Sequence, residues 1–192
     1  MTETVADLFT RGLNVFGEVV ASVGSDGWTR SSPCDGWTTL DVLGHLGTSV
    51  QMGTSLFRGE QPTWPEADRP ADLVDGDPAA YWDSIAGEAR TAFEGADLDL
   101  VMDTPMGPRT VADRLAFPAI DLYVHAWDIG HATGQTIEVP TAVIDLAHHH
   151  IDPLPDDAVR GAKGAFGPEA EAPDDATPTE RFIAWTGRNP RG

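Results

Sequence analysis

Cysteine, basic side chains and long apolar runs are all scarce in this sequence. Its 192 residues include a single cysteine, Cys34, which excludes an internal disulfide and a zinc site built from several cysteines. No uncharged apolar run approaches the roughly 20 residues that a membrane-spanning helix needs. The N-terminus lacks a basic region followed by an apolar stretch, so no signal peptide is expected. These absences predict a cytoplasmic protein in a reducing environment.

Basic residues are also few. The chain has 12 Lys and Arg residues against 31 Asp and Glu residues, which gives a formal net charge of -19. Binding to nucleic acid needs a cationic surface that displaces counterions from phosphate groups. Anionic membranes attract basic segments for a similar reason. We therefore expect no nucleic-acid and no membrane partner. The apolar fraction of 41% is ordinary for a soluble globular protein.

Apolar residues recur every three or four positions in several stretches, which is the pattern of amphipathic helices. The pattern predicts long helices over residues 4–22, 38–58, 78–95 and 110–134, a fifth segment over 140–150 and a short helix over 179–186. Capping boxes begin two of the long helices, at Thr38 and at Thr110. We therefore predict an all-α fold: a four-helix bundle over residues 1–150, with a short additional helix in an irregular C-terminal tail, 151–192, packed on the bundle.

Residues 60–77 are rich in Pro, Asp and Glu and are predicted to form a long loop. Loops of this length are often functional lids, although a disordered surface loop is the more frequent outcome. Residues 96–109 are predicted to be extended or irregular, because Pro and Gly interrupt any helix there.

The most informative stretch, residues 115–127, is apolar apart from Asp121, His125 and one tyrosine hydroxyl. The stretch is too long for a buried strand and is predicted to be a buried helix. Residues four apart lie on one face of a helix, so Asp121 and His125 share a face. A buried carboxylate must be paired, hydrogen-bonded or bound to a metal ion. Asp121 is therefore expected to have a partner elsewhere in the chain.

His45 is the candidate partner, because it lies within the apolar surface of the second predicted helix. Helical bundles can hold metal ions between side chains of facing helices. Two imidazoles and a carboxylate suit zinc, and also iron, manganese or nickel, and leave positions open for water or substrate. His45, Asp121 and His125 are therefore the predicted metal ligands. The alternative is that they are hydrogen-bonded core residues, with Asp121 paired to His125 or to Arg114.

Several polar residues outside the predicted ligand set also have more than one interpretation. Asp128, three residues after His125, is either a partner that orients this histidine or a charge facing water at the helix end. Cys34 is either a reactive thiol or a small buried residue, and we expect the latter, because no basic residue is next to it in sequence. The three histidines 148–150 point in different directions on a helix and are predicted to lie at the surface. His131 is expected at the end of its helix, where a cation is favoured.

Two motifs in the sequence resemble a known family when they are taken together. Residues 33–46 (PCDGWTTLDVLGHL) and 121–128 (DLYVHAWD) resemble the DinB-like metalloenzyme superfamily. Within it they are most similar to the actinobacterial branch related to the N-terminal domain of mycothiol-dependent maleylpyruvate isomerase. The tail, with residues 166–168 (FGP) and 182–188 (FIAWTGR), is similar to the short metal-binding members of that branch.

The resemblance implies a four-helix bundle that holds a divalent metal ion, usually zinc, through a histidine of the second helix and a carboxylate-x-x-x-His pair. The matching positions are His45, Asp121 and His125. The isomerase has a glutamate at the position of Asp121. The aspartate side chain is shorter, so the geometry or the metal preference of the site is expected to differ. The chain also lacks the second domain of the isomerase, so contacts made by that domain cannot be transferred.

The resemblance further implies a low-molecular-weight thiol, bound to the metal ion as a thiolate, and a small electrophilic substrate. The protein is then expected to be a thiol-dependent (mycothiol-type) transferase or isomerase. The alternative is a non-catalytic metal-binding or stress-related helical bundle. Related proteins often form dimers, so a homodimer is compatible with the resemblance.

Overall fold

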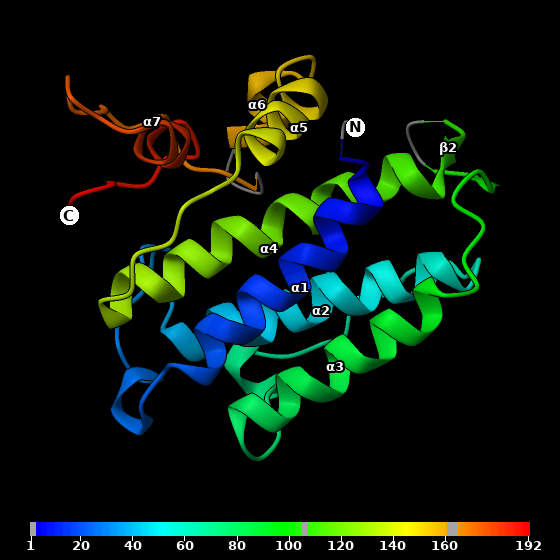
Figure 1. Ribbon diagram of the computed structural model, residues 1–192, viewed down its shortest axis with the longest axis horizontal. Helices are drawn as coiled ribbons and strands as arrows, with labels where there is room; N and C mark the ends of the chain where they lie inside the picture. Colours follow the sequence, from blue (N-terminus) through cyan, green and yellow to red (C-terminus); the bar gives the residue numbers. More distant parts are fainter. Residues whose placement is uncertain (1–2, 105–106, 161–164) are drawn as a thin grey trace.

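Four long helices form the body of the protein: α1 (Val5–Ala21), α2 (Thr39–Phe57), α3 (Pro78–Phe93) and α4 (Val111–Thr133). They are seen in a computed structural model that describes residues 3–104, 107–160 and 165–192. Helix α4 packs against α1 and α2, and α3 packs against the same two helices from the other side (Figure 1). The prediction of an all-α bundle is confirmed, and each long helix lies within a few residues of its predicted range.

The long helices begin where a side chain can accept a hydrogen bond from a backbone amide of the first turn. At α2, the hydroxyl of Thr38 accepts a hydrogen bond from the Asp41 amide, and the Asp41 carboxylate accepts one from the Thr38 amide. The same box opens α4 at Thr110 and Asp113. Helix α4 ends at Gly134, whose φ of 82° is readily available only to glycine. The capped start and the glycine end fix the 23 residues of α4 that carry most of the site.

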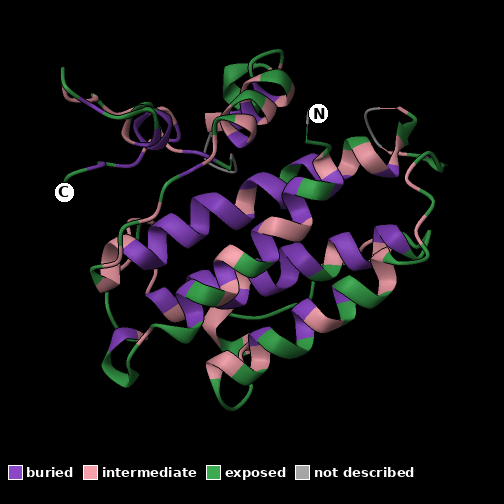
Figure 2. Ribbon diagram, viewed as in Figure 1, coloured by how far each residue is buried: buried purple, intermediate pink, exposed green. Residues whose placement is uncertain are grey.

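Helices α1 and α4 approach each other closely in the centre of the core. A Cβ atom at Gly12 would lie 2.9 Å from the Cβ of Leu122, so only glycine allows this spacing. The buried hydroxyl of Tyr123 donates to the Leu8 carbonyl at 3.0 Å and accepts from Arg11 Nε at 3.2 Å. In Figure 2 the buried residues form a nearly continuous band along α4 and along the inner sides of its neighbours. Helix α4 therefore contributes much of the buried core.

The 60–77 loop is fastened to the N-terminal half of α2. It contains a short 3-10 helix, η2 (Pro70–Leu73), which the sequence did not predict. Asp41, fully buried, accepts hydrogen bonds from the Arg69 guanidinium and from the Ala71 amide. The loop comes so close to α2 that a Cβ at Gly44 would overlap the carbonyl of Pro70. Capping residue Asp41 thus also anchors the loop.

The remaining elements are short. A 3-10 turn, η1 (Ser25–Gly27), follows α1, and β1 (Val101–Met102) pairs antiparallel with β2 (Arg109–Thr110) just before α4. After α4 come α5 (Thr141–Ile151), α6 (Asp156–Arg160) and α7 (Pro178–Trp185), which Figure 1 shows on the side of α4 opposite to α3. Helix α6 was not predicted.

The C-terminal segment is tied to the bundle by apolar and polar contacts. Phe166, Phe182 and Ile183 belong to the buried core cluster. The Thr179 hydroxyl accepts a hydrogen bond from the Val139 amide at 2.9 Å. The division of the chain at residue 150 stays a prediction. No helix in the described ranges is long and apolar enough to cross a membrane.

Candidate metal centre

A cavity of about 930 Å³ opens between the C-terminal segment and the middle turns of α2 and α4. Its floor is polar and its walls are largely apolar or aromatic. It is lined by Pro33, Cys34, Asp35, Trp37, His45, Ser49, Met52, Trp64, Phe117, Pro118, Asp121, Val124, His125, Ala165, Phe166, Gly167, Pro168, Thr186, Gly187 and Arg188. The volume falls in the range of pockets that hold small molecules.

The three predicted ligands, His45, Asp121 and His125, meet in this cavity. Their nearest donor atoms all lie within 4.8 Å of one another. His125 is buried, whereas His45 and Asp121 are half-buried because they face the cavity. The Asp121 carboxylate is thus more open than the apolar stretch around it suggested. The convergence on one point is nevertheless what the spacing of the two motifs predicted.

The residues fit a divalent ion on their donor chemistry. Bonds from zinc to imidazole nitrogen and carboxylate oxygen are about 2.0–2.2 Å, so two donors on one ion are at most about 4.4 Å apart. The separations here need only small side-chain rotations to reach that range. Three protein ligands would leave a coordination position open, as in catalytic rather than structural zinc sites. Their role as metal ligands remains a prediction.

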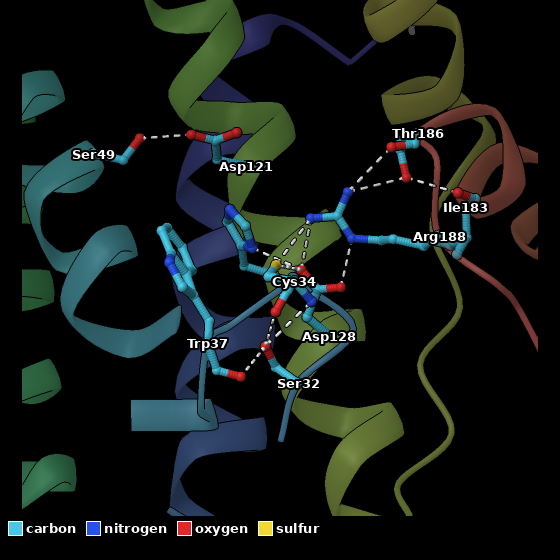
Figure 3. A network of polar contacts seen from close by, with 10 residues as sticks. Ser32, Cys34, Trp37, Ser49, Asp121, Asp128, Ile183, Thr186 and Arg188 are labelled. Atoms are coloured by element: carbon cyan, nitrogen blue, oxygen red, sulfur yellow. Dashed lines mark hydrogen bonds and ion pairs between the residues drawn. The ribbon is translucent and has the colours of Figure 1, made fainter. Parts of the chain in front are cut away.

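Asp121 is held by the opposite helix. The Ser49 hydroxyl of α2 donates to Asp121 Oδ2 at 3.0 Å (Figure 3). Neither alternative partner considered for Asp121 is the one observed: His125 bonds to Asp128, and Arg114 contacts Gln61. One oxygen of the carboxylate is therefore oriented by Ser49.

The His45 imidazole is surrounded by aromatic rings. Its ring centre lies 5.1 Å from Trp37, 5.0 Å from His125 and 6.3 Å from Trp64, whose indole is nearly parallel to it. Burial, together with the charge of His125, lowers the pKa of His45 to about 4. His45 is therefore neutral near pH 7, which is the form that binds a metal ion. Trp64 comes from the 60–77 loop, so this loop contributes one side chain to the pocket wall.

His125 is oriented from behind by Asp128. Its Nδ1 lies 2.7 Å from Asp128 Oδ2, so this nitrogen is committed to the carboxylate and Nε2 is free for the cavity. Asp128 has 0% exposure, which corrects the interpretation of it as a charge facing water. Burial alone would lower the pKa of His125, but the hydrogen bonds and charges of Asp128 and Cys34 outweigh burial and raise it to about 10. Without a metal ion His125 is therefore protonated near pH 7, and an ion bound at Nε2 would have to displace that proton.

Arg188, which follows α7, completes the pairing of Asp128. Its Nε lies 2.6 Å from Asp128 Oδ1 and its Nη2 lies 2.9 Å from Oδ2, a bidentate ion pair (Figure 3). A third contact, 3.2 Å long, joins Nη1 to the Thr186 hydroxyl. Burial alone would raise the pKa of Asp128, but the charges of Arg188 and His125 lower it to about 2. Arg188 ends the tail motif 182–188, but the sequence predicted no role for it at this site, because a tail arginine has no local signal that links it to α4.

Cys34 lies in the same network. Its Sγ is 3.3 Å from Asp128 Oδ2 and 3.4 Å from Arg188 Nη2. We expected Cys34 to be a small buried residue, because no basic residue is next to it in sequence. In the folded protein Arg188 is a basic neighbour, and the thiol is half-buried at the cavity wall. A basic residue beside a cysteine in three dimensions need not be near it in sequence.

The other histidines lie outside the cavity. His148 packs on Trp185 with 4.5 Å between ring centres, and His149 is exposed. His131, in the last turn of α4, stacks on Trp127 at 4.6 Å. His148 and His150 are half-buried, so the predicted surface position holds fully only for His149. Among the described residues, none of these four histidines belongs to a cluster whose geometry fits a metal ion.

Comparison with known proteins places the chain in a family. The family model described as the mycothiol maleylpyruvate isomerase N-terminal domain matches residues 9–130. An uncharacterized protein of Mycobacterium tuberculosis, found in strains CDC 1551 and H37Rv, is 29% identical over 184 residues, which cover 94% of this chain and 96% of the relative.

Two solved structures share the fold. They are the crystal structures of the mycothiol-dependent maleylpyruvate isomerase and of a histidine-to-alanine mutant of it, at 14% and 12% identity and a TM-score of 0.61 each. Each match covers 74% of this chain and 65% of the isomerase chain, so the matched region spans about two thirds of the isomerase. The match to the family model spans more than half of the residues, and on this ground the chain belongs to the mycothiol maleylpyruvate isomerase N-terminal domain family.

Proposed function

We propose that this protein binds a divalent metal ion, with zinc favoured, through His45, Asp121 and His125, and that it is a thiol-dependent isomerase or transferase. The observation that carries the proposal is the convergence of these three donors within 4.8 Å at the floor of a cavity of about 930 Å³. The family supports the same direction, since its description names mycothiol and an isomerase.

The residues around the cavity have separate roles in this proposal. His45 and His125 provide nitrogen donors, and Asp121 provides an oxygen donor that Ser49 orients. Trp37 and Trp64 place two indole rings beside the His45 imidazole. When bound, a dication holds a small thiol as thiolate near neutral pH, which makes it a nucleophile.

The cavity wall favours an uncharged electrophile. Among the lining residues that the structure describes, Arg188 is the sole arginine or lysine, and its guanidinium is already bonded to Asp128. A substrate rich in carboxylates, such as the maleylpyruvate in the relatives' name, would find no free guanidinium among them. Phe117, Met52 and Phe166 offer apolar contact instead. An uncharged α,β-unsaturated carbonyl compound should therefore be processed with a higher kcat/KM than its carboxylate analogue. The reverse preference would contradict this assignment.

Metal content tests the ligand assignment. Protein purified without chelators should contain about one equivalent of metal by mass spectrometry, and His45→Ala and Asp121→Asn should each lose it. His149→Ala is the matched control, because this histidine is exposed and lies outside the cavity. Absence of metal from the wild type after incubation with zinc would refute the proposed centre.

Thiol binding tests the reaction class. Mycothiol added to the cobalt-substituted protein should produce a saturable sulfur-to-cobalt charge-transfer band. Stoichiometric metal without any thiol band would instead favour the non-catalytic metal-binding function.

A further inference from the structure

His125 belongs to two groups of potential metal ligands, not one. The first is His45, Asp121 and His125, and the second is Cys34, His125 and Asp128, whose donor atoms also lie within 4.8 Å of one another. A thiolate, an imidazole and a carboxylate are together a strong zinc donor set. Donor chemistry alone would therefore give the second group at least as strong a claim on an ion as the first.

The guanidinium of Arg188 already fills the second group. It bonds both oxygens of Asp128, at 2.6 Å and 2.9 Å, and lies 3.4 Å from the Cys34 sulfur. Arg188 is 8% exposed and Asp128 0%, so the ion pair lies in a low-dielectric interior. The guanidinium would repel an incoming metal cation strongly there. A dication between Cys34 and Asp128 would have to displace this cation and leave it buried without its partner.

The same contacts prepare His125 for the first group. With Asp128 fixed by Arg188, the carboxylate accepts from Nδ1 of His125, and the free Nε2 is the nitrogen left for an ion beside His45 and Asp121. Removing the guanidinium would release Asp128 and Cys34 together. One residue of the C-terminal segment therefore acts on both groups at once.

We propose that Arg188 is a positioning residue that closes the Cys34–His125–Asp128 group to metal and directs a divalent ion to His45, Asp121 and His125. The inference rests on the proposed metal-binding function. Arg188 lies outside the residues that the family model matches, 9–130. The proposal gives the C-terminal segment a role in selecting between two overlapping ion sites.

Cobalt spectroscopy of the full chain, prepared with a phosphine reductant and no added thiol, tests the proposal. Wild-type protein should bind one Co²⁺ with no sulfur-to-cobalt charge-transfer band. Arg188→Met should show the band, and the double variant Arg188→Met with Cys34→Ser should lose it. An Arg188→Met protein that binds cobalt without a Cys34-dependent band would overturn the proposal.

A second variant covers the case in which Arg188→Met fails to fold. Cys34→Ser alone keeps the ion pair. Its cobalt affinity should match that of the wild type within twofold, and its cobalt spectrum should be unchanged. A larger change would mean that Cys34 already ligates the ion and that Arg188 does not close the group. Failure of the wild type to take up cobalt at all would overturn the proposed metal centre itself, and with it this inference.

Discussion

The buried ion pair between Asp128 and Arg188 should be far more important for stability than any ion pair on the surface. Asp128→Asn is the sharpest perturbation, because asparagine has nearly the same shape and leaves only one carbonyl oxygen. Two contacts from Arg188 and one from His125 converge on this carboxylate. The substitution removes the charge that compensates a guanidinium only 8% exposed.

The expected cost follows from burial. Removing one partner of a buried pair costs about 3–5 kcal/mol, because the other charge remains without compensation. Asparagine keeps part of the hydrogen bonding, so we expect a loss of about 3 kcal/mol in the free energy of unfolding. With a urea m-value of about 2 kcal/mol per molar, the unfolding midpoint should fall by about 1.5 M.

Urea unfolding, followed by circular dichroism in the presence of a chelator, measures this loss without a contribution from bound metal. Asp175→Asn is the matched control. Asp175 also pairs with an arginine, Arg191, at 3.0 Å, but its side chain is 80% exposed, so its loss should cost less than about 1 kcal/mol. Equal midpoints for the two variants would refute the conclusion that burial makes the Asp128 pair important.

Three further outcomes follow from the geometry. The pKa of Asp128 is lowered from 3.8 to about 2, so its ionisation stabilises the fold above about pH 4, and this contribution is lost as the pH falls toward 2; acid titration of Asp128→Asn should lack that component. Gly44→Ala should destabilise the protein, because its Cβ would overlap a loop carbonyl, whereas Gly87→Ala, with open space around it, should stabilise α3 by about 0.5–1 kcal/mol in thermal unfolding. Ser49→Ala should weaken zinc binding about tenfold in calorimetric titration, because Asp121 loses its orienting hydrogen bond; unchanged affinity would mean that Ser49 has no such role.

Local patterns were enough to predict most of the fold. Apolar periodicity located the four long helices, and capping boxes located the start of α2 and α4, because both signals lie within a few consecutive residues. Helix α6 escaped prediction, since its five residues are too few for periodicity and no capping side chain precedes them. The extra partner of Asp41, Arg69, escaped for another reason: the capping box already explained that carboxylate, and the loop contact is tertiary.

The site was predictable to the extent that it lies on one helix. Asp121, His125 and Asp128 share a stripe of α4, so their spacing alone placed them together. His45 needed the further assumption that α2 faces α4. The role of Arg188 could not be found from local sequence, because 60 residues separate it from Asp128 and no short-range pattern links the two. The need of a buried Asp128 for a cation would have been the one available signal.

The two indoles beside His45 make the protein its own optical reporter. Trp37 and Trp64 lie 5.1 Å and 6.3 Å from the imidazole, measured between ring centres. A charge at that distance perturbs an indole. Tryptophan emission should therefore follow ion loading at His45 directly, in unlabelled protein and in real time.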